Sequence, residues 1–167
     1  KNHHHSKLIH HTPTPKRYNI HKHINKKRRP PPMFIVNVEA AIHKDGRWLI
    51  IQRGLKEEHE PGTLSLVGGK VDQEGNVADV LEHTVKREVE EELGIILKDN
   101  VRYVHGVSFV AGDSVHVINI VFLGEIASGE PYRKSPDEVE NIYWMTSEEI
   151  LNHQKTPPWL KEACPPS

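Results

Sequence analysis

The segment Arg87-Glu88-Val89-Glu90-Glu91-Glu92-Leu93-Gly94-Ile95, downstream of Gly68-Gly69-Lys70, is the most informative stretch of this sequence. It sets several carboxylates beside an arginine on one short predicted helix. A helix that only faces a core has no need for so much negative charge, whereas a site that holds divalent cations against a polyphosphate does. The helix itself is predicted by apolar residues that recur every four positions, at Leu81, Val85, Val89 and Leu93.

The ends of this helix also have sequence signals. Asp79, with Glu82 three residues later, predicts a capping box, and Asn76 is a rival N-cap. Gly94 is well placed to end the helix in a left-handed conformation.

The carboxylates of this helix have a defined arrangement. Residues four apart are surface neighbours on a helix, so Glu88, Glu91 and Glu92 should gather on one side, away from the apolar stripe. Oxygen ligands suit hard cations, which favours Mg²⁺, with Mn²⁺ as a second choice. Arg87 can orient Glu91 or bind phosphate through its planar guanidinium. The alternative is a solvated acidic helix face without a ligand.

The flanking segments predict strands around one central helix. Five stretches are rich in β-branched or apolar residues, and Asp45-Gly46 marks a hairpin turn. A second helix is expected at 147–153 with Ser147 as its cap. This pattern predicts an α/β (α+β) fold with helices packed on a mixed sheet. The predicted strands are 33–41, 48–53, 101–110, 115–124 and 141–145, with a short apolar stretch at 63–67 that ends at a Gly68-Gly69 turn.

Together, Gly69 and the segment from Arg87 to Ile95 resemble the box of the Nudix hydrolase family (MutT-like), G-x5-E-x7-R-E-U-x-E-E-x-G-U, where U is aliphatic. The second half of the box matches at every specified position. The first half departs from it: Asp79 stands where the family has glutamate, and nine residues rather than five separate it from Gly69. The resemblance implies an α/β/α sandwich with a mixed sheet, and metal-dependent hydrolysis of a nucleoside diphosphate linked to another moiety.

The resemblance also implies roles for individual residues. Glu88, Glu91 and Glu92 correspond to the metal-binding glutamates, with Glu91, Glu92 and Arg87 as the catalytic set, and Glu91 either a ligand or a group that positions water. The family often adds a carboxylate from a loop before the last strand, for which Glu138 is preferred to Glu140. Asp79 would support Arg87 with a shorter reach. The candidates for substrate binding are Arg53, Gly68, Gly69 and Lys70.

The charge of the chain is divided unevenly. Residues 1–32 hold nine of the 22 Lys and Arg residues and none of the 23 acids, so residues 33–167 carry a net charge of −10. An acidic domain is expected to bind a free nucleotide with the help of cations, and nucleic acid is not an expected partner. The basic leader at 1–32 can be an arm that attracts nucleic acid or a membrane, a native disordered extension, or a leader foreign to a natural chain that starts at Met33. The predicted domain is 33–155, followed by an extended Pro-rich tail at 156–167.

Other features narrow the class of protein. No apolar run is long enough to predict a membrane span, and the single cysteine, Cys164, excludes an intramolecular disulfide. We therefore expect a cytoplasmic protein without a membrane partner, and a homodimer is left open. Two rivals to the enzyme stay open: a Nudix-like domain that binds a nucleotide without turnover, and an acidic interaction domain without a ligand.

Overall fold

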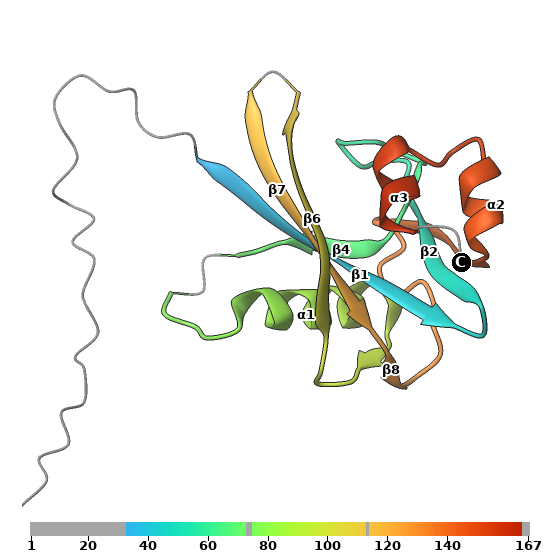
Figure 1. Ribbon diagram of the computed structural model, residues 1–167, viewed down its shortest axis with the longest axis horizontal. Coiled ribbons are helices and arrows are strands. Elements are labelled where there is room, and N and C mark those ends of the chain that lie inside the picture. The colour runs from blue at the N-terminus through green and yellow to red at the C-terminus, as the bar shows by residue number, and fades with distance from the viewer. Residues whose placement is uncertain (1–32, 73–74, 113, 165–167) are drawn as a thin grey trace, which may run out of the picture. The chain divides into compact units, whose positions relative to one another are not determined.

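The structure is a computed structural model that describes residues 33–72, 75–112 and 114–164. Its centre is a mixed seven-stranded sheet (Figure 1). A second, two-stranded sheet pairs β5 with β8, and three helices complete the fold. The strands are β1 (Phe34–Lys44), β2 (Arg47–Arg53), β3 (Leu64–Ser65), β4 (Val67–Lys70), β5 (Ile96–Leu97), β6 (Arg102–Ala111), β7 (Val115–Gly124), β8 (Ile126–Ser128) and β9 (Val139–Met145), and the helices are α1 (Val80–Leu93), α2 (Ser147–Asn152) and α3 (Pro158–Ala163).

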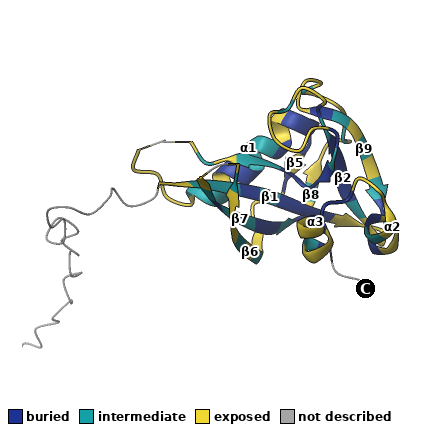
Figure 2. Ribbon diagram, turned by 90° about the horizontal axis from the view of Figure 1, so that it is seen from above, coloured by how far each residue is buried: buried dark blue, intermediate teal, exposed yellow. Residues whose placement is uncertain are grey.

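Two apolar clusters lie on opposite faces of the sheet, and helices cover both. Figure 2 shows α1 and α3 on opposite sides of β1. The first cluster joins α1 to one face of the sheet through the fully buried Val85, Val89 and Leu93. The second joins α2 and α3 to the other face through Ile150 and Leu160. The expected α/β/α arrangement with a mixed sheet is therefore confirmed.

Helix α1 has the predicted stripe and the predicted C-terminus. Gly94 adopts φ 66° and donates its N–H to the Glu90 carbonyl, as a left-handed C-cap requires. The predicted capping box is wrong: Asp79 is the N-cap residue, but it lies in the left-handed region (φ 52°) and its side chain makes no capping hydrogen bond. In that backbone conformation the carboxylate is not directed at the first turn of the helix.

The C-terminal region differs from the prediction in two ways. The N-cap of α2 is Thr146 rather than Ser147; its hydroxyl accepts from Glu149 N, and the Glu149 side chain accepts from Thr146 N, which is a complete capping box. The tail is not extended throughout, because α3 forms there with proline in its first turn. Burial of Leu160 and Cys164 in the second cluster holds this helix against the sheet.

Strand β1 changes partners along its length, and this opens the sheet. Its residues 37–40 pair with β4, whereas only its last two residues, His43 and Lys44, pair with β2. On its other edge β1 runs parallel to β7 over nine residue pairs. The hairpin at the far end follows the Asp45-Gly46 signal, with both residues at positive φ. Strands β4 and β2 therefore pair with different parts of the same edge of β1, and the sheet is open between them.

The glycine pair was expected to form a turn, but Gly68 and Gly69 lie inside strand β4. Each is needed because another group approaches its Cα closely. A Cβ on Gly68 would lie 2.0 Å from the Val38 carbonyl oxygen, and a Cβ on Gly69 would lie 2.4 Å from the Glu88 carboxyl carbon. The basic leader at 1–32 lies outside the described residues. None of the described helices is long and apolar enough to cross a bilayer.

Candidate active site

A cavity of about 270 Å³ lies where β1 and β4 separate from β2, beside α1. Another hollow, of about 610 Å³, lies along β9 and α2, but Glu149 is the one carboxylate among the described residues that line it. The smaller cavity concentrates the charged groups that phosphate chemistry requires, so we take it as the candidate site. Its lining residues are Asn37, Ile51, Arg53, Glu57, Gly68, Gly69, Lys70, Asp72, Glu88, Glu92 and Glu138.

Glu92 is the most informative side chain in this cavity. It is only 6% exposed. Among the described residues, no group forms a hydrogen bond or an ion pair with its carboxylate. Burial, followed by the charges of Glu138 and Glu88, raises the pKa of Glu92 to about 8, although Arg53 opposes this. A buried carboxylate without a hydrogen bond or an ion pair is costly, and a bound cation would remove that cost.

Glu88 reaches the cavity from the preceding turn of α1. Its carboxylate lies against the Cα of Gly69, so that a Cβ at this position would displace it. It is also paired with Arg87, with Oε1 and Nη2 2.8 Å apart. Burial raises the pKa of Glu88, Arg87 lowers it, and Glu91 and Glu138 raise it further, with a net rise. The second glycine of the Gly68-Gly69 pair therefore leaves room for a carboxylate of the site, that of Glu88.

Arg87 organises the acidic side chains on the outer side of α1. Its Nη1 contacts Glu91 Oε2 at 2.9 Å, and its Nη2 contacts Asp72 Oδ2 at 3.1 Å as well as Glu88. Burial lowers the pKa of Arg87, but Glu88, Glu91 and Asp72 outweigh it and raise the pKa overall. Glu91 is 55% exposed in its side chain and does not line the cavity, so the structure places it apart from Glu88 and Glu92.

The expectation that Asp79 supports Arg87 is wrong. That position at the guanidinium is taken by Asp72, three residues after Gly69. Asp72 reaches Arg87 from the segment that follows β4, whereas Asp79 lies at the N-terminus of α1. Sequence reasoning missed Asp72, although its closeness to the glycine pair was a usable signal.

Two loops supply the remaining charged groups. At the end of β2, Arg53 donates from Nη2 to Glu57 Oε2 at 2.9 Å and from Nε to the His59 carbonyl at 3.1 Å. Glu138 lies in the loop before β9 and lines the cavity, whereas Glu140 is 4.0 Å from Arg133 and does not. Glu57 is a fourth glutamate of the cavity, and sequence reasoning missed it because a loop acid has no periodic signal.

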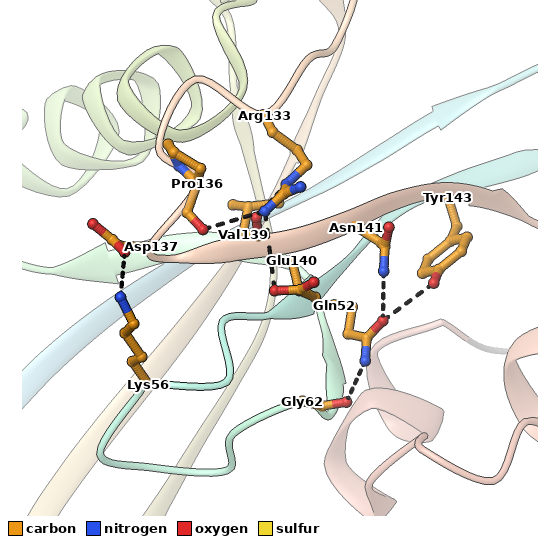
Figure 3. A network of polar contacts seen from close by, with 10 residues as sticks. All are labelled: Gln52, Lys56, Gly62, Arg133, Pro136, Asp137, Val139, Glu140, Asn141 and Tyr143. Atoms are coloured by element: carbon orange, nitrogen blue, oxygen red, sulfur yellow. Dashed lines mark hydrogen bonds and ion pairs between the residues drawn. The ribbon is translucent and has the colours of Figure 1, made fainter.

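These two loops are tied to each other. Gly54 N donates to the Glu138 carbonyl at 2.7 Å, and Lys56 Nζ is 3.3 Å from Asp137 Oδ1. At the other end of the loop, Gln52 Nε2 donates to the Gly62 carbonyl at 3.1 Å (Figure 3). Gln52 Oε1 accepts from Asn141 and Tyr143 of β9. The loop 54–62 is therefore fixed at both of its ends beside the segment that carries Glu138.

Comparison with known proteins agrees with this arrangement. A family model described as NUDIX domain matches residues 33–165. The chain belongs to the Nudix family. The match includes α3, so the Nudix domain continues through most of the segment that was expected to be a separate tail.

The relatives of this Nudix domain include proteins named as Nudix hydrolases or MutT proteins. An uncharacterized Nudix hydrolase from Yersinia pestis is 32% identical over 106 residues, which is 63% of this chain and 54% of the relative, so the chain spans about half of that protein. A MutT NUDIX hydrolase from Burkholderia pseudomallei has a similar structure, with TM-score 0.67 and 34% identity over 78% of this chain and 95% of the other. A MutT protein from Methanosarcina mazei Go1 has TM-score 0.65 and 26% identity over 80% and 92% of the two chains.

The donor set of this Nudix domain fits a hard divalent cation. Glu57, Glu88, Glu92 and Glu138 present only oxygen ligands to one cavity, and Glu92 has no hydrogen bond or ion pair among the described residues. Within the described parts of the chain, no three Asp, Glu, His or Cys side chains already stand in a cation-holding arrangement. Two of the four carboxylates are instead paired with Arg87 and Arg53. The conformation is thus one in which arginines hold part of the donor set.

Proposed function

We propose that this protein is a Mg²⁺-dependent pyrophosphohydrolase, with Mn²⁺ as a substitute, that cleaves a nucleoside diphosphate linked to another moiety. The observation that carries the proposal is the buried carboxylate of Glu92, which has no described partner and faces a cavity shared with three other glutamates. Arg53 and Lys70 line the same cavity and supply positive charge for phosphate groups. Candidate substrates are oxidised or ordinary nucleoside triphosphates, ADP-ribose-like nucleotides and dinucleoside polyphosphates.

The residues divide the chemistry between them. Glu88, Glu92 and Glu138 would hold the cation, which neutralises phosphate charge and makes attack by water easier. The oxygen of a water molecule forms a bond to phosphorus, the bridging P–O bond breaks, and the water proton passes to a cavity carboxylate. Arg53 and Lys70 stabilise the charge that develops on the phosphate oxygens. Arg87 acts as a positioning residue, because its bonds to Asp72 and Glu91 fix the guanidinium that contacts Glu88.

Glu91 has a narrower role in this proposal than the family resemblance implies. It lies outside the cavity and bonds to Arg87, so we assign it to the support of Arg87 and Glu88. A change in its rotamer would be needed before Glu91 could contact a cation in the cavity.

The experiment is a measurement of phosphate and pyrophosphate release from a panel of nucleoside diphosphate derivatives with Mg²⁺ or Mn²⁺. The wild type is compared with Glu92→Gln and with Glu90→Gln, an exposed glutamate on the same helix that does not line the cavity. We expect cation-dependent release, lost by about two orders of magnitude or more in Glu92→Gln and kept in Glu90→Gln. No release across the panel, with nucleotide binding retained, would instead support the rival function of a non-catalytic nucleotide sensor.

The remaining expectations about partners stay predictions. The negative charge of residues 33–167 favours a nucleotide with its cation over nucleic acid as the partner. A homodimer is tested by sedimentation equilibrium. A cytoplasmic location rests on the single cysteine and is tested by fractionation of the source cells.

A further inference from the structure

Glu57 occupies a place that the proposed function does not explain. It lies in the loop 54–62, yet it lines the same cavity as Glu88, Glu92 and Glu138. Its side chain is 29% exposed. The next residue, Glu58, is exposed and does not line the cavity. Among the glutamates of this loop, Glu57 is therefore the one that lines the cavity.

The partner of Glu57 is itself a residue of the cavity. Arg53 Nη2 is 2.9 Å from Glu57 Oε2, and the two side chains are 30% and 29% exposed. The same guanidinium is a candidate for binding substrate phosphate. A phosphate group carries more charge than a carboxylate and offers more acceptor oxygens in the geometry that guanidinium prefers. A bound phosphate would therefore compete with Glu57 for Arg53.

The position of Glu57 does not depend on Arg53 alone. Gly54 N donates to the Glu138 carbonyl, and a Cβ on Gly54 would lie 2.0 Å from the Asp137 carbonyl oxygen. The Lys56–Asp137 pair adds a second tie between the loops (Figure 3). If Arg53 turned to a phosphate, Glu57 would stay beside Glu138 and Glu92, and three neighbouring carboxylates would repel each other unless a cation lay between them.

We propose that Glu57 is a further ligand of the divalent cation, held by Arg53 until a phosphate group of the substrate takes the guanidinium. This inference rests on the proposed function, because it requires that the cavity holds a cation next to a phosphate. Arginines hold two of the four carboxylates, Glu57 and Glu88, and the arginine that holds Glu57 is the one that a substrate phosphate would occupy. Cation and phosphate would then strengthen each other's binding.

The test follows Mn²⁺ binding to the full chain by electron paramagnetic resonance, without turnover. Imidodiphosphate, a non-hydrolysable diphosphate, is the phosphate probe, and affinities are compared at defined free Mn²⁺. Four proteins are used: the wild type, Glu57→Gln, the matched control Glu58→Gln, and Glu92→Gln. Spin-echo measurements in D₂O compare the number of water molecules on bound Mn²⁺.

If Arg53 releases Glu57 to the cation only when a phosphate is bound, the effect of Glu57→Gln on Mn²⁺ affinity should depend on imidodiphosphate. Without imidodiphosphate, Glu57→Gln should bind Mn²⁺ within about twofold of the wild type, because in the wild type Arg53 then holds the Glu57 carboxylate and keeps it from the cation. With imidodiphosphate, it should bind Mn²⁺ about tenfold more weakly and show an additional coordinated water where the carboxylate is missing. Glu58→Gln should match the wild type in both conditions.

Three results would overturn the inference. Equal Mn²⁺ affinity and equal hydration in Glu57→Gln and the wild type, both with imidodiphosphate, would remove Glu57 from the ligand set. A weaker affinity with unchanged hydration would mean that Glu57 acts only through its charge. If the wild type binds no Mn²⁺, or if Glu92→Gln binds it normally, the cation site of the proposed function fails as well. The first two results, by contrast, would reject the role of Glu57 and leave the cation site in place.

Discussion

At the scale of single residues, two adjacent glycines serve two different purposes. Gly68 allows β4 to lie against the backbone of β1 at Val38, whereas Gly69 leaves room for the carboxylate of Glu88. The first contact is with rigid backbone, and the second is with the end of a side chain that can move. The same substitution should therefore damage stability at one position and the cation site at the next.

We predict that Gly69→Ala keeps the fold but weakens Mn²⁺ binding by about tenfold or more, because the new methyl group displaces Glu88 from the cavity. Gly68→Ala should instead lower the free energy of unfolding by about 2 kcal/mol or more, since strand β4 must move away from β1. Thermal unfolding and Mn²⁺ titration of both variants test the pair. Equal effects of the two substitutions in both assays would contradict this assignment.

The titration of Glu92 gives a second prediction at this scale. Its pKa rises from 4.5 to about 8 on folding, so the folded state binds the proton more tightly than the unfolded state. The stabilisation that this provides is fully present below about pH 4.5 and is lost as pH rises through about 8. In the absence of cations, the free energy of unfolding should fall by at most about 5 kcal/mol across that window.

Urea unfolding in EDTA at several pH values measures this effect, with Glu92→Gln as the comparison. The variant should show a flatter dependence on pH, since its amide does not titrate. Cation affinity should change in the opposite direction and rise with pH up to about 8, because Mg²⁺ must displace the proton from Glu92.

At the scale of the elements, α1 joins the core to the site. Its inner stripe is fully buried at Val85, Val89 and Leu93, while Glu88 and Glu92 leave the same helix toward the cavity. A change of register in this helix would move both sets together. The stability of the stripe is therefore a condition for the geometry of the carboxylates.

Leu93→Ala should lower the free energy of unfolding by about 2–5 kcal/mol, because it leaves a cavity in the first apolar cluster. The measurement is chemical unfolding followed by circular dichroism. Lys86→Ala on the same helix serves as a control, because the partner of Lys86 in its ion pair, Asp99, is fully exposed, and a change within about 1 kcal/mol is expected.

The elements also show how far sequence reasoning extends. Helix α1 and the long strands β1, β2, β6 and β7 were predictable, because each has a strong local period or many β-branched residues. The short elements β5, β8 and α3 were not, since tertiary packing holds them and they carry almost no local signal. The cavity depends on the change of partners along β1, which no local pattern encodes.

The same limit applies to the site. Glu88, Glu92 and Glu138 were predicted, and the cavity brings them together, because the box resemblance and the loop position identify them. Glu57 and Asp72 were missed, since their roles come from the path of two loops and not from a helical or strand period. The predicted contact of Asp79 with Arg87 was wrong for the same reason: the path of the segment after β4, and not the spacing in the box, decides which acid reaches the arginine.

At the scale of the whole molecule, the uneven charge is the dominant property. Residues 33–167 carry a net charge of −10, and the basic residues at 1–32 bring the whole chain close to neutrality. Removal of residues 1–32 should leave turnover in the presence of saturating Mg²⁺ within about twofold, because all the charged groups that we assign to the reaction lie in the described part of the chain, between Arg53 and Glu138. Steady-state kinetics of the shortened and full chains, with the same substrate and buffer, test this; a loss of tenfold or more would assign the leader a part in catalysis.

The parallel pairing of β1 with β7 has a consequence for how the chain acquires its structure. Asn37 and Asn119 are neighbours in the folded sheet and are hydrogen-bonded, but 82 positions separate them in the chain. During synthesis, the apolar strand β1 is therefore made before most of the domain, and it stays without its parallel neighbour until β7 has been made. Closure of so long a segment is slow compared with the formation of hairpins. Refolding should consequently be limited by the meeting of these two strands, and the nascent chain is most exposed to aggregation just before β7 is complete.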